Sequence, residues 1–118
     1  MRDDRLPSKT IIGYCNDIKE YIEYFGNSEE EFLRNTIFQR CCAFDVFQIG
    51  EAVKSLSKEI RDSHPDVQWR KIAGFRDVIA HNYGGIETDD LWIAITAEVP
   101  ELKKSCERIL IEISSKEV

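Results

Sequence analysis

Apolar residues recur at steps of three and four positions along nearly the whole chain, which is the spacing of one face of an α-helix. No stretch alternates apolar and polar residues for long enough to predict a strand. The sequence therefore predicts an all-α protein, an antiparallel bundle of four main helices that forms one domain over residues 1–118. An apolar fraction of 42% in 118 residues is enough for a modest core.

The first helix has one clear apolar face and a clear end. Gly26–Asn27 is a typical helix stop, and Ser28 with Glu31 three positions later has the pattern of a capping box for the next helix. The apolar face consists of Ile11, Cys15, Ile18, Ile22 and Phe25.

A long second helix is predicted from Ser28 to Arg61, roughly 50 Å if it is unbroken. It carries two apolar stripes, which predicts burial against more than one neighbour. Gly50 is expected either to bend this helix or to let another backbone approach closely. The main stripe is Cys42, Val46, Ile49, Val53, Leu56 and Ile60, and the second stripe is Leu33, Ile37, Cys41 and Phe44.

Two further helices complete the bundle. Pro65 predicts a turn over residues 63–66, and a third helix is expected over about Asp66–His81. Thr88 is expected to cap a fourth helix, with two acidic residues in its first turn where the helix dipole favours them. Pro100 should kink this last helix or split it in two.

Composition excludes several classes of protein. The charged start lacks the apolar core of a signal peptide and no membrane span is present, so we expect a cytoplasmic protein. None of the four cysteines forms a Cys-x-x-Cys pair and no carboxylates recur at metal-site spacing, so we expect reduced core thiols and no metal or cofactor. A net charge of −6 argues against non-specific coating of nucleic acid. Arg70, Lys71 and Arg76 could still form a local basic pocket, or be solvated charges.

One short segment gathers reactive side chains at the end of the third helix. Arg76, Asp77, His81, Asn82 and Tyr83 lie within eight positions, directly before two glycines. Such a cluster is compatible with a catalytic corner. The alternative is that the histidine caps the helix and the tyrosine is an ordinary core or surface aromatic.

The segments 49–52, 69–83 and 91–92 together resemble the HepT toxins, which are HEPN-domain proteins encoded beside a minimal nucleotidyltransferase antitoxin. The resemblance rests on the Arg76-x4-His81-x-Tyr83 spacing and on the order of the flanking signals. Asp77 stands where HEPN motifs often carry asparagine.

The resemblance implies a metal-independent endoribonuclease that dimerises and places two copies of the motif at the interface. His81 would be the general base, with its symmetry mate as the acid, and Arg76 would grip the scissile phosphate. Asp77 would orient one of these two or remain a solvated acid. Asn82 would donate to the phosphate or cap the helix, and Tyr83 would position RNA.

The resemblance also implies a partner, because in this family the antitoxin transfers AMP to the tyrosine of the His-x-Tyr element. By resemblance Tyr83 is that residue, and the added phosphate would bring negative charge next to Arg76. Glu51 is expected either to pair with Arg76 in the pocket or to be solvated. Transfer RNA is the substrate that the family suggests.

Helix geometry supports the dimer. Five helical steps separate Arg76 from His81, so the two side chains would diverge by about 140° on one regular helix. They can converge if the helix ends before His81, if Arg76 reaches around, or if a partner chain contributes one of them. Two alternatives to the enzyme remain, a non-catalytic HEPN subunit that binds a nucleotidyltransferase, and a purely structural helical dimer.

Overall fold

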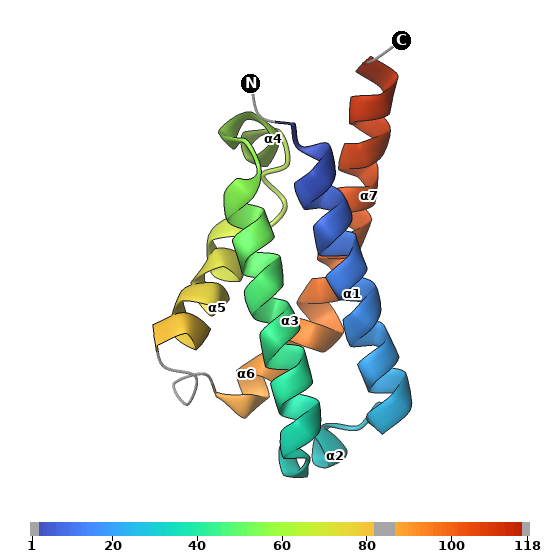
Figure 1. Ribbon diagram of the computed structural model, residues 1–118, viewed down its shortest axis with the longest axis vertical. Coiled ribbons are helices and arrows are strands. Elements are labelled where there is room, and N and C mark those ends of the chain that lie inside the picture. The colour runs from blue at the N-terminus through green and yellow to red at the C-terminus, as the bar shows by residue number, and fades with distance from the viewer. Residues whose placement is uncertain (1–2, 82–86, 117–118) are drawn as a thin grey trace.

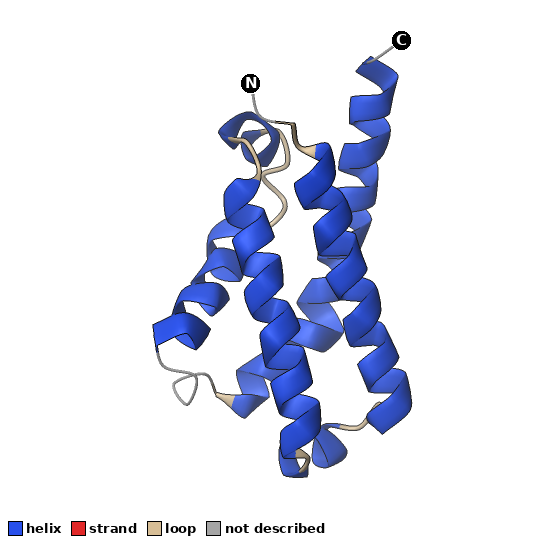
Figure 2. Cartoon of the chain, viewed as in Figure 1, coloured by secondary structure: helices blue, strands red, loops and turns tan. Residues whose placement is uncertain are grey.

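The computed structural model describes residues 3–81 and 87–116, and every regular element in these ranges is a helix (Figures 1 and 2). The prediction of an all-α bundle with four main helices, α1, α3, α5 and α7, is confirmed. No described helix has the length and apolar character that crossing a bilayer requires. The elements in chain order are α1 (Arg5–Phe25), α2 (Glu29–Arg34), α3 (Thr36–Ser55), α4 (Lys58–Asp62), α5 (Trp69–His81), α6 (Thr88–Ile93), the π-helical segment η2 (Ala94–Glu98) and α7 (Val99–Lys116).

Helix α3 organises the bundle because it lies between α1 and α5 and packs extensively on both (Figure 1). Helix α7 packs on α1, and the short helices α2 and α6 lie near the N-terminal end of α3. The main apolar stripe of α3 is buried as predicted, and an aromatic group closes the core at this end. That group consists of Phe25, Phe32, Phe38 and Trp92.

The end of α1 follows the sequence closely. Gly26 has a φ of +118°, which glycine adopts without strain, and its N–H donates to the carbonyl of Ile22 at 2.9 Å. Ser28 then caps α2, since its hydroxyl accepts from the N–H of Glu31 at 3.3 Å. Both features were predicted, and together they turn the chain back into the bundle.

The prediction of one unbroken helix over residues 28–61 is wrong. The Asn35 side chain accepts from the N–H of Phe38 at 3.0 Å and starts α3, and the Ser57 hydroxyl accepts from the N–H of Ile60 at 3.1 Å and starts α4. Each of these side chains accepts a hydrogen bond from a backbone N–H that has no partner within its helix. A new helix therefore begins at each of the two positions. Apolar spacing runs through both breaks and does not reveal them.

The third helix begins later than predicted, and the fourth begins one residue earlier. α5 begins at Trp69, whose indole N–H donates to the carbonyls of Arg61 and His64 at 3.1 Å each. Glu87, not Thr88, is the N-cap of α6, and no side-chain cap forms there. Pro100 does not split the last helix, because residues 88–116 are helical without a break. The hydrogen-bond pattern instead changes to that of a π-helix in η2, directly before α7, in which Pro100 is the second residue.

Candidate active site

A glycine sets the distance between α3 and α5 at the site. Gly50 on α3 faces the first side-chain carbon atoms of Arg76, and a methyl group at Gly50 would overlap them and lie 3.3 Å from the carbonyl oxygen of Ile72. Of the two roles predicted for Gly50, the close approach of a second backbone is therefore the one that the structure contains. Its effect is to press the Arg76 side chain against α3.

The Arg76 guanidinium is held by three groups. Its Nε donates to the Glu51 carboxylate, its Nη1 donates to Asp77 Oδ1 at 3.2 Å, and its central carbon lies 5.2 Å from the centroid of the Phe47 ring. Lys54 completes the cluster with a 2.5 Å ion pair to Asp77 Oδ1. Two cations and two carboxylates therefore balance one another on the α3–α5 seam, and the Arg76 side chain keeps 27% of its surface exposed.

The pKa shifts in this cluster follow from its hydrogen bonds. The hydrogen bond to Glu51 raises the pKa of Arg76, and the hydrogen bond from Lys54 lowers the pKa of Asp77. Arg76 thus remains a cation and Asp77 remains an anion at neutral pH. A substrate phosphate would have to take over the guanidinium donors that the two carboxylates now occupy.

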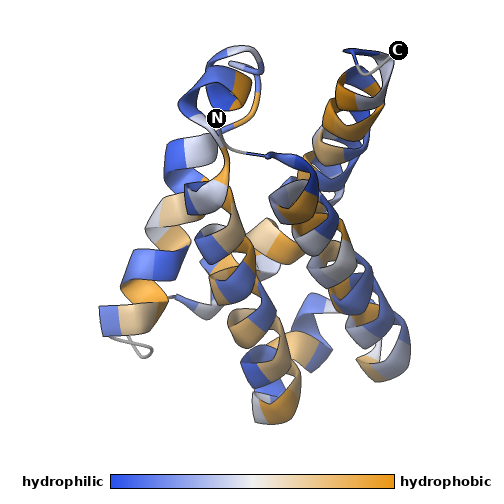
Figure 3. Ribbon diagram, turned by 45° about the horizontal axis from the view of Figure 1, so that its top comes forward, coloured by the Kyte–Doolittle hydropathy of each residue, from blue (hydrophilic) through white to orange (hydrophobic). Residues whose placement is uncertain are grey.

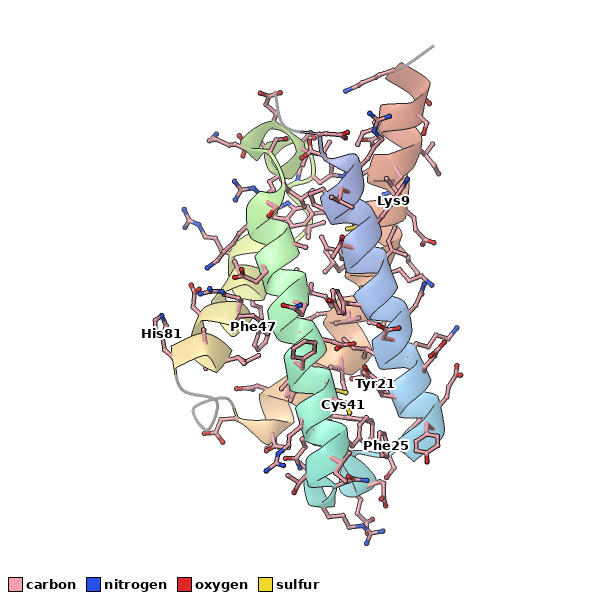
Figure 4. All side chains as sticks on the ribbon, viewed as in Figure 1. Lys9, Tyr21, Phe25, Cys41, Phe47 and His81 are labelled. Carbon is pink, nitrogen blue, oxygen red and sulfur yellow. The ribbon has the colours of Figure 1, made fainter. Side chains whose placement is uncertain are left out.

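His81 lies apart from this cluster. It is the last residue of α5, is exposed, and projects away from the bundle at the free end of the helix (Figure 4). The predicted option that the helix ends before His81 is therefore wrong. Arg76 also does not reach around α5, because its guanidinium is bound on the α3 side. Asn82 and Tyr83 lie outside the described residues.

The remaining basic candidates do not join Arg76. Lys71 pairs with Glu98 of η2 at 2.5 Å, and Arg70 is exposed without an ion pair to any described residue. The other histidine, His64, is buried and lies 3.0 Å from a carboxylate oxygen of Glu112, away from the Arg76 cluster.

Sequence reasoning missed Phe47 and Lys54. The signal was present, because Phe47, Glu51 and Lys54 are spaced by four and three positions and therefore share one face of α3. In Figure 4 the Phe47 ring points from α3 toward α5, where Arg76 lies over it. The Phe47 ring gives Arg76 a stacking surface, and Lys54 is the counter-ion of Asp77.

The second apolar stripe of the sequence continues along α3 beside this cluster. Helix α3 does pack on two neighbours, α1 and α5, as predicted, but this stripe is not buried against either of them, since Ile37 is 64% and Phe44 is 59% exposed, while Cys41 is half-buried. Leu33 on α2 is exposed as well. We call these four residues the α3 stripe; apolar bands on the N-terminal half of α3 are visible in Figure 3. Such a contiguous exposed apolar surface is typical of an interaction site.

One chain thus offers the fixed guanidinium of Arg76 and the carboxylates of Glu51 and Asp77. It also offers the His81 imidazole, a group that can donate or accept a proton. Within residues 3–81 and 87–116, no three histidine, cysteine, aspartate or glutamate side chains gather closely enough to hold a metal ion.

Comparison with known proteins agrees with this residue set. The family described as "Ribonuclease HepT-like" matches residues 11–109. No solved structure matches the chain significantly.

This chain aligns with nearly the whole length of three relatives. "Putative RNase MJ1216" of Methanocaldococcus jannaschii is 34% identical over 95% of this chain and 97% of its own length. "Putative RNase TTE0752" of Caldanaerobacter subterraneus is 36% identical over 93% and 96%. "Probable ribonuclease HepT" of Thermococcus cleftensis is 32% identical over 81% and 92%. The prediction of an RNA-cleaving enzyme agrees with these names, and the chain belongs to the HepT-like family of ribonucleases.

Proposed function

We propose that this protein is a metal-independent endoribonuclease whose active site forms between two copies of the chain, and that it acts as the toxin of a toxin–antitoxin pair. One observation carries the proposal. Arg76 is fixed on the α3 side of α5, whereas His81 projects from the free end of the same helix. A second copy supplies a histidine to each arginine without unwinding the helix.

The proposed reaction needs a base, an acid and a cation. His81 of one chain removes the proton of the RNA 2′-hydroxyl, and the symmetry-related His81 protonates the leaving 5′-oxygen. Each such proton transfer typically contributes about 10²–10⁴-fold in rate. Arg76 binds the scissile phosphate through its planar fork and stabilises the charge that develops on it.

Glu51 and Asp77 keep the fork of Arg76 in place before RNA binds. Because both carboxylates already bond the guanidinium, its orientation is set in the free protein. The Phe47 ring supports the guanidinium from α3 and remains available when a phosphate displaces a carboxylate. The site is therefore preorganised, which lowers the entropy lost on binding.

We infer that the α3 stripe is the dimer surface. It is apolar, exposed and continuous along α3 with the face that carries Phe47 and Glu51. A two-fold axis through this surface would bury the same side chains of both copies and bring the two Arg76 clusters toward each other.

Neutralisation would act on Tyr83. Transfer of AMP to its hydroxyl by a partner nucleotidyltransferase would place a phosphate near Arg76 and exclude the phosphate of RNA. Transfer RNA in the cytoplasm is the substrate suggested by the resemblance to HepT toxins.

The experiment is a cleavage assay with purified protein, transfer RNA and a chelator of divalent metals. We expect His81→Ala and Arg76→Ala each to lower cleavage at saturating RNA by at least about 10²-fold. Arg70→Ala is the matched control on the same helix and should weaken RNA binding only, with a smaller salt dependence.

Mixing tests the composite site. Two inactive variants, Arg76→Ala and His81→Ala, should regain partial activity when their chains are exchanged into mixed dimers. If wild-type protein does not cleave RNA under any of these conditions, the enzyme proposal is wrong and the chain is a binding subunit. If wild type cleaves but mixing never restores activity, each site needs either both residues from one chain or the histidines of both chains.

A further inference from the structure

A groove of about 390 Å³ lies between α5 on one side and α6 and η2 on the other, and none of its lining residues belongs to the Arg76 cluster. Its volume is within the range of about 300–1,000 Å³ that small-molecule sites occupy. Val78 is 41% and Ile93 is 50% exposed in this groove, and Phe75 between them in the lining is half-buried. A methyl group at Gly74 would meet no atom within 4 Å. The groove therefore offers an apolar surface that a ligand can reach.

The α5 wall of this groove leads to His81. Residues spaced by three, four and three positions share one face of a helix, and this spacing relates Lys71, Gly74, Val78 and His81. Neighbours on such a face lie about 5–6 Å apart between their Cβ atoms. Helix α6 follows α5 in the chain and lies at the end of α5 from which His81 projects (Figures 1 and 4). An RNA nucleotide with its 2′-hydroxyl at His81 can therefore place its base, or the base of its neighbour, in the groove.

The charges of the groove exclude a phosphate and admit a neutral base. Lys71 is the only cation among the described residues that line it, and it pairs with Glu98 at 2.5 Å. Asp90 also lines the groove, and its carboxylate has no hydrogen bond or ion pair to a described residue. The local charge is therefore negative, which repels the RNA backbone. An ionised carboxylate only accepts hydrogen bonds, so Asp90 favours a ligand that presents a donor.

We propose that this groove binds one base of the RNA substrate, with the flat face of the base against Val78 and Ile93 and its exocyclic amino group donating to Asp90. The inference rests on the proposed ribonuclease activity, to which it adds a preference for a base with an amino group, such as adenine, beside the cleaved bond. The face of the base gains by leaving water, and the amino group gains a charge-assisted hydrogen bond. Single-stranded RNA is commonly recognised in this way, by packing on the face of a base and hydrogen bonds to its edge.

The first test measures binding without cleavage. It compares two short oligodeoxynucleotides, one of adenine and one of unsubstituted purine, which is the same ring system without the amino group. Neither has a 2′-hydroxyl, so neither can be cut by the proposed reaction. We expect wild type to bind the adenine oligonucleotide about fivefold more tightly in fluorescence anisotropy, the value of one hydrogen bond.

Two neighbouring aspartates provide a variant and its matched control. Asp90→Ala should bind both oligonucleotides equally, because the acceptor is gone. Asp89→Ala makes the same change of charge in the same turn of α6, but Asp89 does not line the groove, so the preference for adenine should remain. The ratio of the two affinities is the readout, since the lost negative charge acts on both oligonucleotides alike.

A third variant tests the apolar surface. Ile93→Ser should weaken binding of both oligonucleotides, with the helical circular-dichroism signal and the mass in light scattering of wild type retained. Ile111→Ser, at an exposed position of α7, should have no effect on binding. A monomeric Ile93→Ser protein would make the groove a protein interface and overturn the proposal.

Cleavage of the corresponding RNA oligonucleotides separates this proposal from the proposed function. We expect wild type to cut the adenine RNA faster than the purine RNA, and Asp90→Ala to lose that difference. Binding that prefers adenine without any cleavage would support the groove and refute the enzyme. Cleavage with no preference would support the enzyme and refute the groove. The groove proposal is also overturned if wild type binds neither oligonucleotide, or if Asp90→Ala and Asp89→Ala behave alike.

Discussion

At the scale of single residues, the position of Arg76 depends on the absence of a side chain at Gly50. The missing methyl group lets α5 approach until Arg76 reaches Glu51 and Phe47 on the opposite helix. Glycine in a helix interior costs about 1 kcal/mol relative to alanine. Here that cost is offset by a close helix contact that also fixes the Arg76 guanidinium.

Replacing Gly50 with alanine should therefore be harmful, although alanine favours helices. The new methyl group would overlap the Arg76 side chain, and we expect the free energy of unfolding to fall by about 1–3 kcal/mol, as in other overpacked sites. RNA cleavage should fall with it, because Arg76 must move. Chemical denaturation and the cleavage assay measure the two effects.

Gly74→Ala is the matched control for that substitution. Gly74 is also inside a helix, but an added methyl group there meets no atom within 4 Å. We expect the free energy of unfolding to rise by roughly 0.5–1 kcal/mol from helix propensity alone. Equal effects of the two substitutions would show that the contact at Gly50 is unimportant.

Residue-level reasoning from the sequence reached part of this site. It named Arg76 and His81 as candidates, which stay predictions, and it named pairing with Arg76 as one of two roles for Glu51, which the structure contains. It missed Phe47 and Lys54, because an aromatic residue and a lysine on a helix are common and acquire meaning only when a second helix packs beside them. Long-range contacts of that kind are not encoded in local spacing.

At the scale of elements, helix type and order follow from apolar periodicity, but helix ends depend on single capping side chains. Asn35 and Ser57 divide the predicted long helix without interrupting its apolar pattern. The π-helical η2 was not predicted as such; only the disruption by Pro100 was. What the α3 stripe contacts could not be predicted from local spacing, because no element within residues 3–81 and 87–116 covers it.

A buried acid joins two of these elements. Asp45 of α3 is 2% exposed, accepts a hydrogen bond from Tyr21 of α1, and has one carboxylate oxygen without a partner among the described residues. Burial raises the pKa of Asp45 to about 6, with Asp17 acting in the same direction. In Figure 4 the labelled Tyr21 lies on the side of α1 that faces α3.

This acid predicts a pH-dependent stability. The folded chain holds the Asp45 proton more tightly than the unfolded chain, whose value is near 3.8. Stability is therefore lost as pH rises from about 4 to about 6, and the loss above that range is about 3 kcal/mol. Asp45→Asn should be more stable than wild type at pH about 7.5 and nearly equal to it at pH about 4.

Urea unfolding at one protein concentration across this pH range measures the difference. Tyr21→Phe removes the hydrogen bond that opposes the shift, so its loss of stability should extend to higher pH than that of wild type. A stability difference between Asp45→Asn and wild type that is the same at every pH would contradict the assignment.

At the scale of the whole molecule, the acidic chain carries the exposed apolar α3 stripe beside its balanced cluster of charges. The four residues of the α3 stripe are compatible with the proposed homodimer. A net charge of −6 opposes long-range attraction of RNA, so binding depends on the local cations.

Phe44→Glu tests the dimer surface. It would place two like charges close together across a two-fold axis, so we expect a single-chain mass in place of twice the 13.7 kDa chain mass, with helix content retained and cleavage lost. Light scattering and circular dichroism measure these outcomes. Ile111→Glu is the control, because Ile111 is 66% exposed on α7, and it should leave mass and cleavage unchanged. A wild-type protein that is monomeric at assay concentration and still cleaves RNA would refute the composite site.

The Arg76 cluster has a consequence for the timing of activity. Because Gly50, Glu51 and Phe47 hold the arginine within one chain, each free copy already carries Arg76 in a fixed position. This arginine therefore does not need a second copy to position it. At concentrations below the dimer dissociation constant, the number of complete sites should rise with the square of the number of chains. Doubling the concentration of active chains would give about four times the rate of RNA cleavage. A small loss of neutralisation would therefore cause a disproportionate rise in activity.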